Sequence, residues 1–330
     1  MKRRQFIGLV GTAALGFPRP AVAETKTDLP VVGILVPPTM EPANDALAAV
    51  RIGLQEAGLV EGTNYSFAMR FANGDLDRLP SLAMELGALK PRVIVASSTA
   101  ARAVRTVLPD VALVFTSVSV DPIAYGYAQS YVRPGGMMTG NVTNAMGSEE
   151  ALTEKRMNFF KELVPGVTRL GIIGPNGILY KAELTALRKV SAHFGFEVVE
   201  YATPTLDGLE GAFASGVRNG VSAFYISGEP LLFNNISRVM PLVAACGRPC
   251  VGVYPEFGRA GLLMSYSSDT LDGFRHAGIY AAKILGGAKP GDLPIEQASR
   301  FIFVINLRTA KALGITVPPA LLTLADEVIE

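Results

Sequence analysis

The chain has 330 residues, of which 49% are hydrophobic and 18% charged, and its formal net charge is +1. The apolar fraction excludes a disordered protein, and the balanced charge gives no reason to expect a nucleic-acid partner. Two histidines in the whole chain leave little material for a histidine-built metal site. Because one core rarely extends beyond about 250–300 residues, the length favours two domains.

Residues 1–23 have the pattern of a cleavable export signal. A basic start precedes the apolar stretch Phe6–Phe17, and Ala21–Ala23 is typical of a signal-peptidase site. The stretch is shorter than the about 20 residues that a membrane span needs. Arg3–Ile7 resembles the twin-arginine motif, so that route and the general secretory route both stay open. No cysteine lies near the cleavage point, and we expect a periplasmic protein without a lipid anchor or a membrane-embedded segment.

Beyond this leader, apolar runs and helical patterns alternate, which is typical of parallel α/β sheets. Val31–Val36 is an uninterrupted apolar run ended by two prolines, as expected of a strand buried on both faces. The helical pattern of Ala43–Ala57 stops at Gly58, a candidate left-handed cap. Further strands are expected at Tyr65–Arg70, Arg92–Ala96 and Ala112–Thr116, with helices at Leu76–Leu89 and Ala100–Val107.

A second unit repeats this order. Leu170–Pro175 echoes Val32–Pro37, and the helix after it stops at a glycine again, Gly195. The repeat predicts two similar doubly wound parallel-sheet lobes. Further strands of the second unit are expected at Glu197–Tyr201, Ala223–Ile226, Cys250–Val253 and Leu262–Ser265.

The tail is too short to build a third core. We expect lobe 1 at residues 24–145 and lobe 2 at residues 146–269, completed by about 270–300 and 301–330 respectively. Such returns cross the hinge several times and leave a cleft between the lobes. The elements expected in the tail are a helix at Thr270–Leu285, a strand at Phe301–Leu307 and a short helix around Thr309–Leu313.

The motifs of several enzyme classes are missing. No G-x-G-x-x-G follows a strand, and neither a G-x-x-x-x-G-K-[ST] phosphate loop nor a G-x-S-x-G nucleophile elbow is present. His193 and His276 lie in helical patterns without the spacing of metal ligands. We therefore expect no catalytic residue, no metal and no cofactor.

Cys246 and Cys250 are the two cysteines, and their C-x-x-x-C spacing differs from the redox motif C-x-x-C. A disulfide across this loop is one prediction for an oxidising compartment, and two reduced, partly buried thiols are the other. An extended turn would hold the Cα atoms farther apart than the about 7 Å that a disulfide spans.

Several separated segments follow the order of one known family: Gly53–Asn64, Asp121–Ile123, Arg133–Thr143, Gly261–Tyr266, Ile305–Gly314 and the ending Val317–Glu327. With them the chain resembles the ABC-transporter substrate-binding proteins of the tryptophan/tyrosine-binding type, over essentially everything after the leader. The resemblance implies a two-lobed periplasmic binding protein of type I that serves a separate membrane permease and ATPase. The cysteine pair and Met137–Met138 depart from the family's usual pattern.

Ligands of open parallel sheets bind beyond the carboxyl ends of the strands, where polar residues gather in this sequence. Ser98 and Thr99 at a helix start suit a ligand carboxylate, although a hydroxyl there also caps a helix. Asp121 or Glu229 suits an amine, although an acid before proline also forms turns. The candidate ligand-binding residues are Thr39, Ser97, Ser98, Thr99, Thr116, Ser117, Asp121, Asn176, Ser227, Glu229 and Glu256.

Apolar surface for a ligand side chain is expected from Tyr254 and Phe115, although aromatic residues at strand ends are more often core. We expect a monomeric receptor, not an enzyme, that captures an amino acid or a related carboxylate and delivers it to a permease. One alternative is an exported sensor that docks on a membrane receptor without transport. Another is an exported α/β hydrolase that uses acids in the same cleft, against which the absent nucleophile elbow and scarce histidines count.

Overall fold

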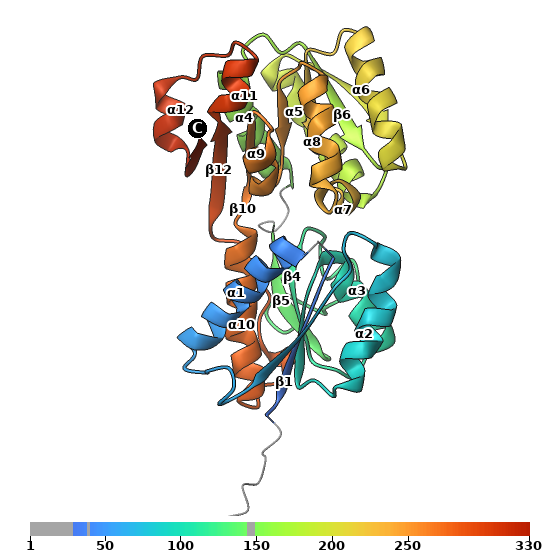
Figure 1. Ribbon diagram of the computed structural model, residues 1–330, viewed down its shortest axis with the longest axis vertical. Helices are drawn as coiled ribbons and strands as arrows, with labels where there is room; N and C mark the ends of the chain where they lie inside the picture. Colours follow the sequence, from blue (N-terminus) through green and yellow to red (C-terminus); the bar gives the residue numbers. More distant parts are fainter. Residues whose placement is uncertain (1–28, 38–39, 144–148) are drawn as a thin grey trace, which may run out of the picture.

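Two sheets organise the chain in a computed structural model that describes residues 29–37, 40–143 and 149–330. Figure 1 shows one lobe above the other, with the C-terminus in the upper lobe. The expected pair of doubly wound lobes is confirmed, and the export signal expected at residues 1–23 lies outside the described residues. No helix in the described part of the chain is both long and apolar enough to cross a membrane.

The first lobe holds a six-stranded sheet in the order β11-β5-β4-β3-β1-β2, with every neighbouring pair parallel. The apolar run predicted as its first strand forms β1 near the centre, where Ile34 and Leu35 are fully buried. The strands are β1 (Val31–Val36), β2 (Ser66–Phe71), β3 (Val93–Ser97), β4 (Leu113–Val118), β5 (Met138–Val142) and β11 (Glu296–Gln297).

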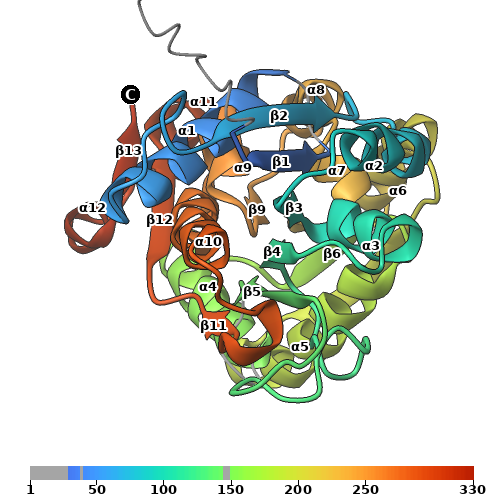
Figure 2. The ribbon, with the colours of Figure 1, turned by 90° about the horizontal axis from the view of Figure 1, so that it is seen from below.

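Helices cover both faces of this sheet, as Figure 2 shows from below. α1 (Met40–Glu56) and α10 (Thr270–Leu285) lie on one face, and α2 (Leu79–Ala88) and α3 (Ser98–Val107) lie on the other. The backbones of α1 and α10 touch, because a Cβ on Gly53 would lie 1.9 Å from the Arg275 carbonyl oxygen. The helix α10, distant in sequence from α1, is therefore an integral part of the first lobe.

The second lobe repeats the plan with a seven-stranded sheet in the order β13-β12-β10-β9-β8-β6-β7. The order β7-β6-β8-β9-β10 matches β2-β1-β3-β4-β5 of the first lobe, and β12 is added antiparallel to β10. The strands are β6 (Arg169–Gly174), β7 (Glu197–Ala202), β8 (Ala223–Ile226), β9 (Cys250–Gly252), β10 (Met264–Ser268), β12 (Phe301–Asn306) and β13 (Glu327–Ile329).

The helices of the second lobe enclose its core, where the partly buried Phe159 stacks on the buried Phe303. The predicted stop at Gly195 is confirmed, since this residue caps α5 with a left-handed φ of 67°. The helices are α4 (Glu149–Leu163), α5 (Ile178–Phe194), α6 (Leu209–Arg218), α7 (Pro230–Phe233), α8 (Ile236–Ala245), α9 (Pro255–Ala260), α11 (Leu307–Ala312) and α12 (Pro319–Leu324).

The chain passes between the sheets after β5, between β10 and α10, and between β11 and β12. In each sheet the second strand lies on one side of the first strand, β1 or β6, and the third strand lies on the other side. The loops at the carboxyl ends of the strands diverge at this point, where ligands of such sheets bind. The carboxyl edges of the two sheets face the space between the lobes.

Candidate functional site

A cavity lies between the lobes, and we call it the cleft cavity. The first lobe lines it with the ends of β1, β3 and β4, with α1 and with the first two turns of α10. The second lobe lines it with α7 and the segment after β9. Its empty volume is about 680 Å³, part of which is open to solvent.

Buried polar atoms without partners are concentrated here. In the described part of the chain, six buried side-chain atoms lack a hydrogen-bond partner, and three of them are Ser117 Oγ, Asn234 Nδ2 and Glu256 Oε2 of the cleft cavity. A fourth, Thr99 Oγ1, lines the neighbouring compartment. Because unpartnered buried polar groups are costly and rare, their concentration at one place makes the cleft cavity the candidate site.

Ser117 has a strained backbone. Its φ of 53° lies in the left-handed region, which is unfavourable for a residue with a Cβ. The pairing of β4 with β5 shifts register at this point, between Phe115 and Val118. Strained backbone of this kind is concentrated at functional sites. Here it places a serine between the cleft cavity and a second pocket at the hinge.

Glu256 presents an acid to the same cavity from the first turn of α9. Its Oε1 accepts a hydrogen bond from the Thr270 hydroxyl at 3.2 Å, and Arg259 lies 3.9 Å away. Burial is the largest effect on this carboxyl and raises its pKa, while its Oε2 has no partner. A cation that entered the cavity would meet an acid without a complete ion pair.

Aromatic rings form the apolar wall of the cavity. Phe233 and Tyr254 of the second lobe pack edge to face with centroids 4.6 Å apart, and Phe274 faces them from α10 of the first lobe. The Tyr254 hydroxyl donates to the Gly228 carbonyl at 3.0 Å, which holds the ring in place. The expectation that Tyr254 offers apolar surface is consistent with this placement, whereas Phe115 is fully buried core.

A second compartment adjoins the cleft cavity and shares Pro230 with it. The start of α3 lines it with Thr99 and Arg102, and the second lobe contributes Ile178 and Glu229. Glu229 is mostly engaged already, because its Oε1 accepts from the Tyr180 backbone N–H at 2.9 Å. Burial nevertheless raises the pKa of this carboxyl.

Two hydrogen bonds to Glu183 of α5 hold the loop after β8 in place. The Ser227 hydroxyl donates to its Oε2 at 2.5 Å, and the Gly228 N–H donates to its Oε1 at 2.9 Å. Burial raises the pKa of Glu183 to about 8. Ser227 is itself fully buried, so its hydroxyl positions the loop.

Of the remaining sequence-based candidates, some line the cleft cavity, some are buried in the core and some are exposed to solvent. Ser97 lines the cleft cavity, whereas Thr116 is fully buried and donates to Asn141 Oδ1 at 2.8 Å. Asp121 is exposed and accepts from the Ile123 backbone N–H at 3.0 Å, which is the contact of a turn former.

Asn176 is exposed and borders neither of the two compartments. Ser98 begins α3, and Thr39 lies outside the described residues.

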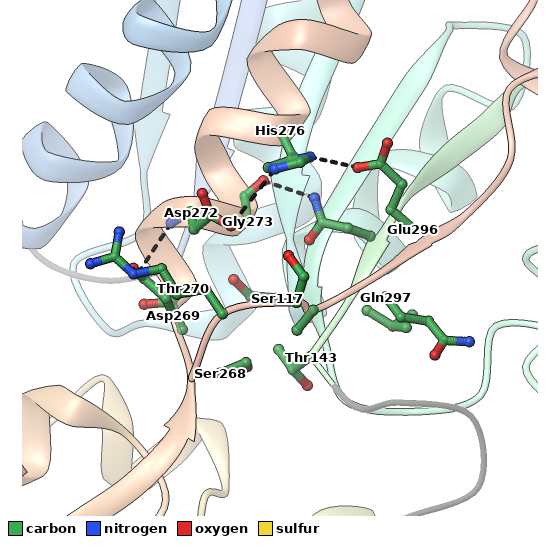
Figure 3. A pocket seen from close by; sticks show the side chains of 15 residues that line it. Ser117, Thr143, Ser268, Asp269, Thr270, Asp272, Gly273, His276, Glu296 and Gln297 are labelled. Atoms are coloured by element: carbon green, nitrogen blue, oxygen red, sulfur yellow. Dashed lines mark hydrogen bonds and ion pairs between the residues drawn. The ribbon is translucent and has the colours of Figure 1, made fainter. Parts of the chain in front are cut away.

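A pocket at the hinge adjoins the cleft cavity through Ser117 and Thr270. Figure 3 shows His276 of α10 pointing toward Glu296 of β11, and their Nδ1 and Oε2 atoms lie 2.7 Å apart. Segments from all three passages between the sheets meet in this pocket. Across the described ranges, no group of three or more histidine, cysteine, aspartate or glutamate side chains is arranged to hold a metal ion.

The sequence reasoning missed several cleft residues, among them Arg102, Phe233, Asn234 and Phe274. Arg102 lies one helical turn beyond Thr99, so the helical period alone places it on the same face. Phe233 and Phe274 lie in helices, and Asn234 directly follows α7. Packing between the lobes brings these three residues into the cleft, and the sequence carries no local signal for it.

The chain also has recognisable relatives. A tyrosine-binding protein of Clostridioides difficile (strain R20291) is 24% identical over 262 residues, which are 79% of this chain and 74% of that protein. The structure of the ABC domain in complex with L-Trp from Streptococcus pneumonia is 21% identical with a TM-score of 0.79, and covers 91% of this chain and 100% of that one. A ligand-free, open substrate-binding protein with adhesive properties from Clostridium difficile is 20% identical with a TM-score of 0.68, covering 92% and 99%.

These structural likenesses confirm the type I fold. The family model described as ABC transporter substrate binding protein matches residues 32–329. The resemblance derived from the sequence motifs is thereby confirmed, and the chain belongs to the family of ABC transporter substrate-binding proteins.

Proposed function

We propose that this protein is the exported receptor of an ABC importer and captures an aromatic amino acid between its lobes. The observation that carries the proposal is the cleft cavity, where unpartnered buried polar atoms lie beside an aromatic wall. Relatives that are named for binding tyrosine or contain bound L-Trp support the same ligand class.

The polar end of the cavity matches the two charges of an amino acid. The free Glu256 Oε2 is an acceptor for the ammonium group, and the Ser117 hydroxyl and the Asn234 amide nitrogen are donors for the carboxylate. Hydrogen bonds to charged groups contribute roughly 1.5–3 kcal/mol each, and here they also satisfy atoms that are unpartnered without ligand.

The apolar end matches an aromatic side chain. Phe233, Tyr254 and Phe274 offer ring faces and edges from both lobes. Aromatic pairs in offset or edge-to-face geometry contribute about 0.5–1.5 kcal/mol beyond the area they bury. A small aliphatic side chain would leave this wall partly uncovered, so we expect tryptophan, tyrosine and phenylalanine to bind more tightly than alanine or serine.

Contacts from both lobes make binding and closure one event. Ser117 and Phe274 belong to the first lobe, and Asn234 and Glu256 belong to the second. A ligand that touches both lobes binds the closed form better, and the shift toward closure equals its difference in affinity for the two forms. We propose that the closed receptor is recognised by a separate permease with its ATPase, and that residues 1–23 direct export to the periplasm.

A thermal-shift panel tests the ligand class. The protein released from the periplasm by osmotic shock is heated with each common amino acid, with sugars and with aromatic acids that lack an amine. We expect the aromatic amino acids to raise the unfolding midpoint most, because a ligand at 100 times its Kd adds about 2.7 kcal/mol to stability. A larger shift with sugars than with any amino acid would overturn the assignment, and retention of the protein in the cytoplasm would overturn the proposed export.

A further inference from the structure

We propose that Cys246 and Cys250 form a disulfide that ties the end of α8 to the start of β9 in the oxidising compartment. The proposal uses the export that we propose above, but it is independent of the ligand. It concerns the edge of the second lobe farthest from the cleft, since β9 begins at Cys250 and Tyr254 and Glu256 follow its other end.

The two sulfur atoms are already close. Both cysteines are free thiols, and their Sγ atoms lie 3.8 Å apart. A disulfide bond is about 2.05 Å long, so closure needs a further approach of roughly 1.8 Å, within reach of side-chain rotation. The segment between them is not an extended turn, since Gly247 has a left-handed φ of 60° and the two sulfur atoms meet across it.

The two thiols differ in a way that sets the order of reaction. Cys246 is partly exposed at the end of α8, and Cys250 is buried. The hydrogen bond from the Cys250 thiol is the main effect that lowers the pKa of Cys246, and the neighbouring Arg248 adds to it. Burial raises the pKa of Cys250. Cys246 is therefore the thiol that meets an oxidant first, in its more reactive thiolate form.

The reaction balances with a small disulfide such as glutathione disulfide as the oxidant. Cys246 loses its proton and attacks one sulfur of the oxidant, which breaks the oxidant's S–S bond and releases one glutathione thiolate. Cys250 then loses its proton and attacks Cys246 Sγ in the mixed disulfide, which releases the second glutathione thiolate. Two electrons pass from the cysteine pair to the oxidant, and the two protons leave with the two glutathione molecules.

The disulfide would add a covalent link between α8 and β9 within the second lobe. In the reduced form the Cys246 thiol donates to the Val243 carbonyl at 3.0 Å, a weak bond that oxidation replaces with a covalent one. The closed loop is short, so the stabilisation is modest, and we expect oxidation to raise the unfolding midpoint by about 3 °C. Ligand affinity stays unchanged, because the cleft residues lie beyond the opposite end of β9.

Intact mass and thiol alkylation test the proposal. Periplasmic protein is quenched with acid, denatured with an alkylating reagent and weighed, and a reduced sample is weighed after incubation with glutathione disulfide. We expect both samples to carry no alkyl group and to be lighter than the reduced chain by two hydrogen atoms. Two alkylated cysteines in both samples would overturn the proposal, and so would a stable glutathione adduct on Cys246 of the wild-type protein.

Single variants resolve the roles of the two thiols. Cys250→Ser is expected to accumulate glutathione on Cys246, whereas Cys246→Ser is expected to keep a free thiol at position 250. The opposite pattern would overturn the order of attack. A protein that forms the disulfide but binds no aromatic amino acid would refute the proposed ligand and leave the disulfide intact, so the two failures are distinguishable.

Discussion

Replacing Glu256 by glutamine tests the ammonium site directly. The substitution keeps the size of the side chain and an oxygen that accepts from Thr270, which lies 3.2 Å from Oε1, but it removes the charge. An ammonium that hydrogen-bonds Oε2 gains roughly 1.5–3 kcal/mol from the charged partner. Its loss corresponds to about a ten- to hundredfold weaker Kd.

Calorimetry with a matched pair of ligands isolates this interaction. L-Tryptophan carries the amine, whereas indolepropionate has the same ring and carboxylate without it. We expect Glu256→Gln to lose about ten- to a hundredfold in affinity for tryptophan and little for indolepropionate. Equal losses for both ligands, or no loss for tryptophan, would refute the assignment of Glu256.

The pH dependence gives a second readout for the same group. Burial raises the pKa of the Glu256 carboxyl in the empty cleft, so an ammonium ligand must bind in competition with a proton. Affinity of the wild-type protein for tryptophan should therefore fall as the pH is lowered through this raised pKa, and Glu256→Gln should lack that fall. The variant should unfold at or above the wild-type temperature, because it removes a buried charge.

Three further substitutions test strain, buried charge and helix packing. Ser117→Gly relieves a left-handed φ of 53° and removes an unpartnered hydroxyl, so unfolding should require about 1 kcal/mol more while ligand binding weakens about tenfold. Glu183→Gln should flatten the pH dependence of stability. The wild-type carboxyl has its pKa raised from 4.5 to about 8, so the unfolded chain loses its proton first and stability falls between these pH values, by on the order of 5 kcal/mol. Gly53→Ala forces a Cβ to within 1.9 Å of the Arg275 carbonyl oxygen and should cost about 3 kcal/mol, whereas Gly211→Ala, with nothing within 4 Å, should be neutral or stabilising.

Thermal and urea unfolding measure all three stabilities, and calorimetry measures the binding of the Ser117 variant. Unchanged ligand affinity in Ser117→Gly would remove Ser117 from the site. The same pH dependence of stability in the wild-type protein and in Glu183→Gln between pH 4.5 and 8 would contradict the raised pKa of Glu183. Equal effects of Gly53→Ala and Gly211→Ala would contradict the close approach of α1 and α10.

The sequence was a good guide to elements with strong local signals. Val31–Val36 forms a strand within the bounds expected from its apolar run, and α5 ends at Gly195 because a glycine accepts a φ of 67° without strain. The short elements β11, β13 and α12 were not foreseen. Strands of two or three residues depend on pairing with distant segments, here β5 and β12, and carry no periodicity of their own.

The residues of the candidate site also fall into those that a local sequence signal identifies and those that only the packing of the whole chain brings together. Ser97 and Ser117 lie at the carboxyl ends of β3 and β4, and Glu256 lies in the helix after β9. The rule that ligands bind at the carboxyl edge of a parallel sheet selects all three. Phe233 and Phe274 enter the cleft from helices of opposite lobes, which only the packing of the whole chain brings together.

Residue chemistry alone was less selective. An aspartate before proline suits both a ligand amine and a turn, and Asp121 makes the hydrogen bond of a turn, to the Ile123 backbone N–H.

The fluorescence of L-tryptophan reports directly whether an aromatic amino acid binds in the cleft cavity. The chain contains no tryptophan, so the indole emission in a mixture of protein and L-tryptophan comes from the ligand alone. Burial between Phe233, Tyr254 and Phe274 removes the indole from water and shifts its emission to shorter wavelength. We expect this shift to saturate at one tryptophan per protein and to be reversed by excess L-tyrosine. An unchanged emission spectrum at saturating protein, with no heat of binding for tyrosine or phenylalanine, would contradict the capture of aromatic amino acids between the lobes.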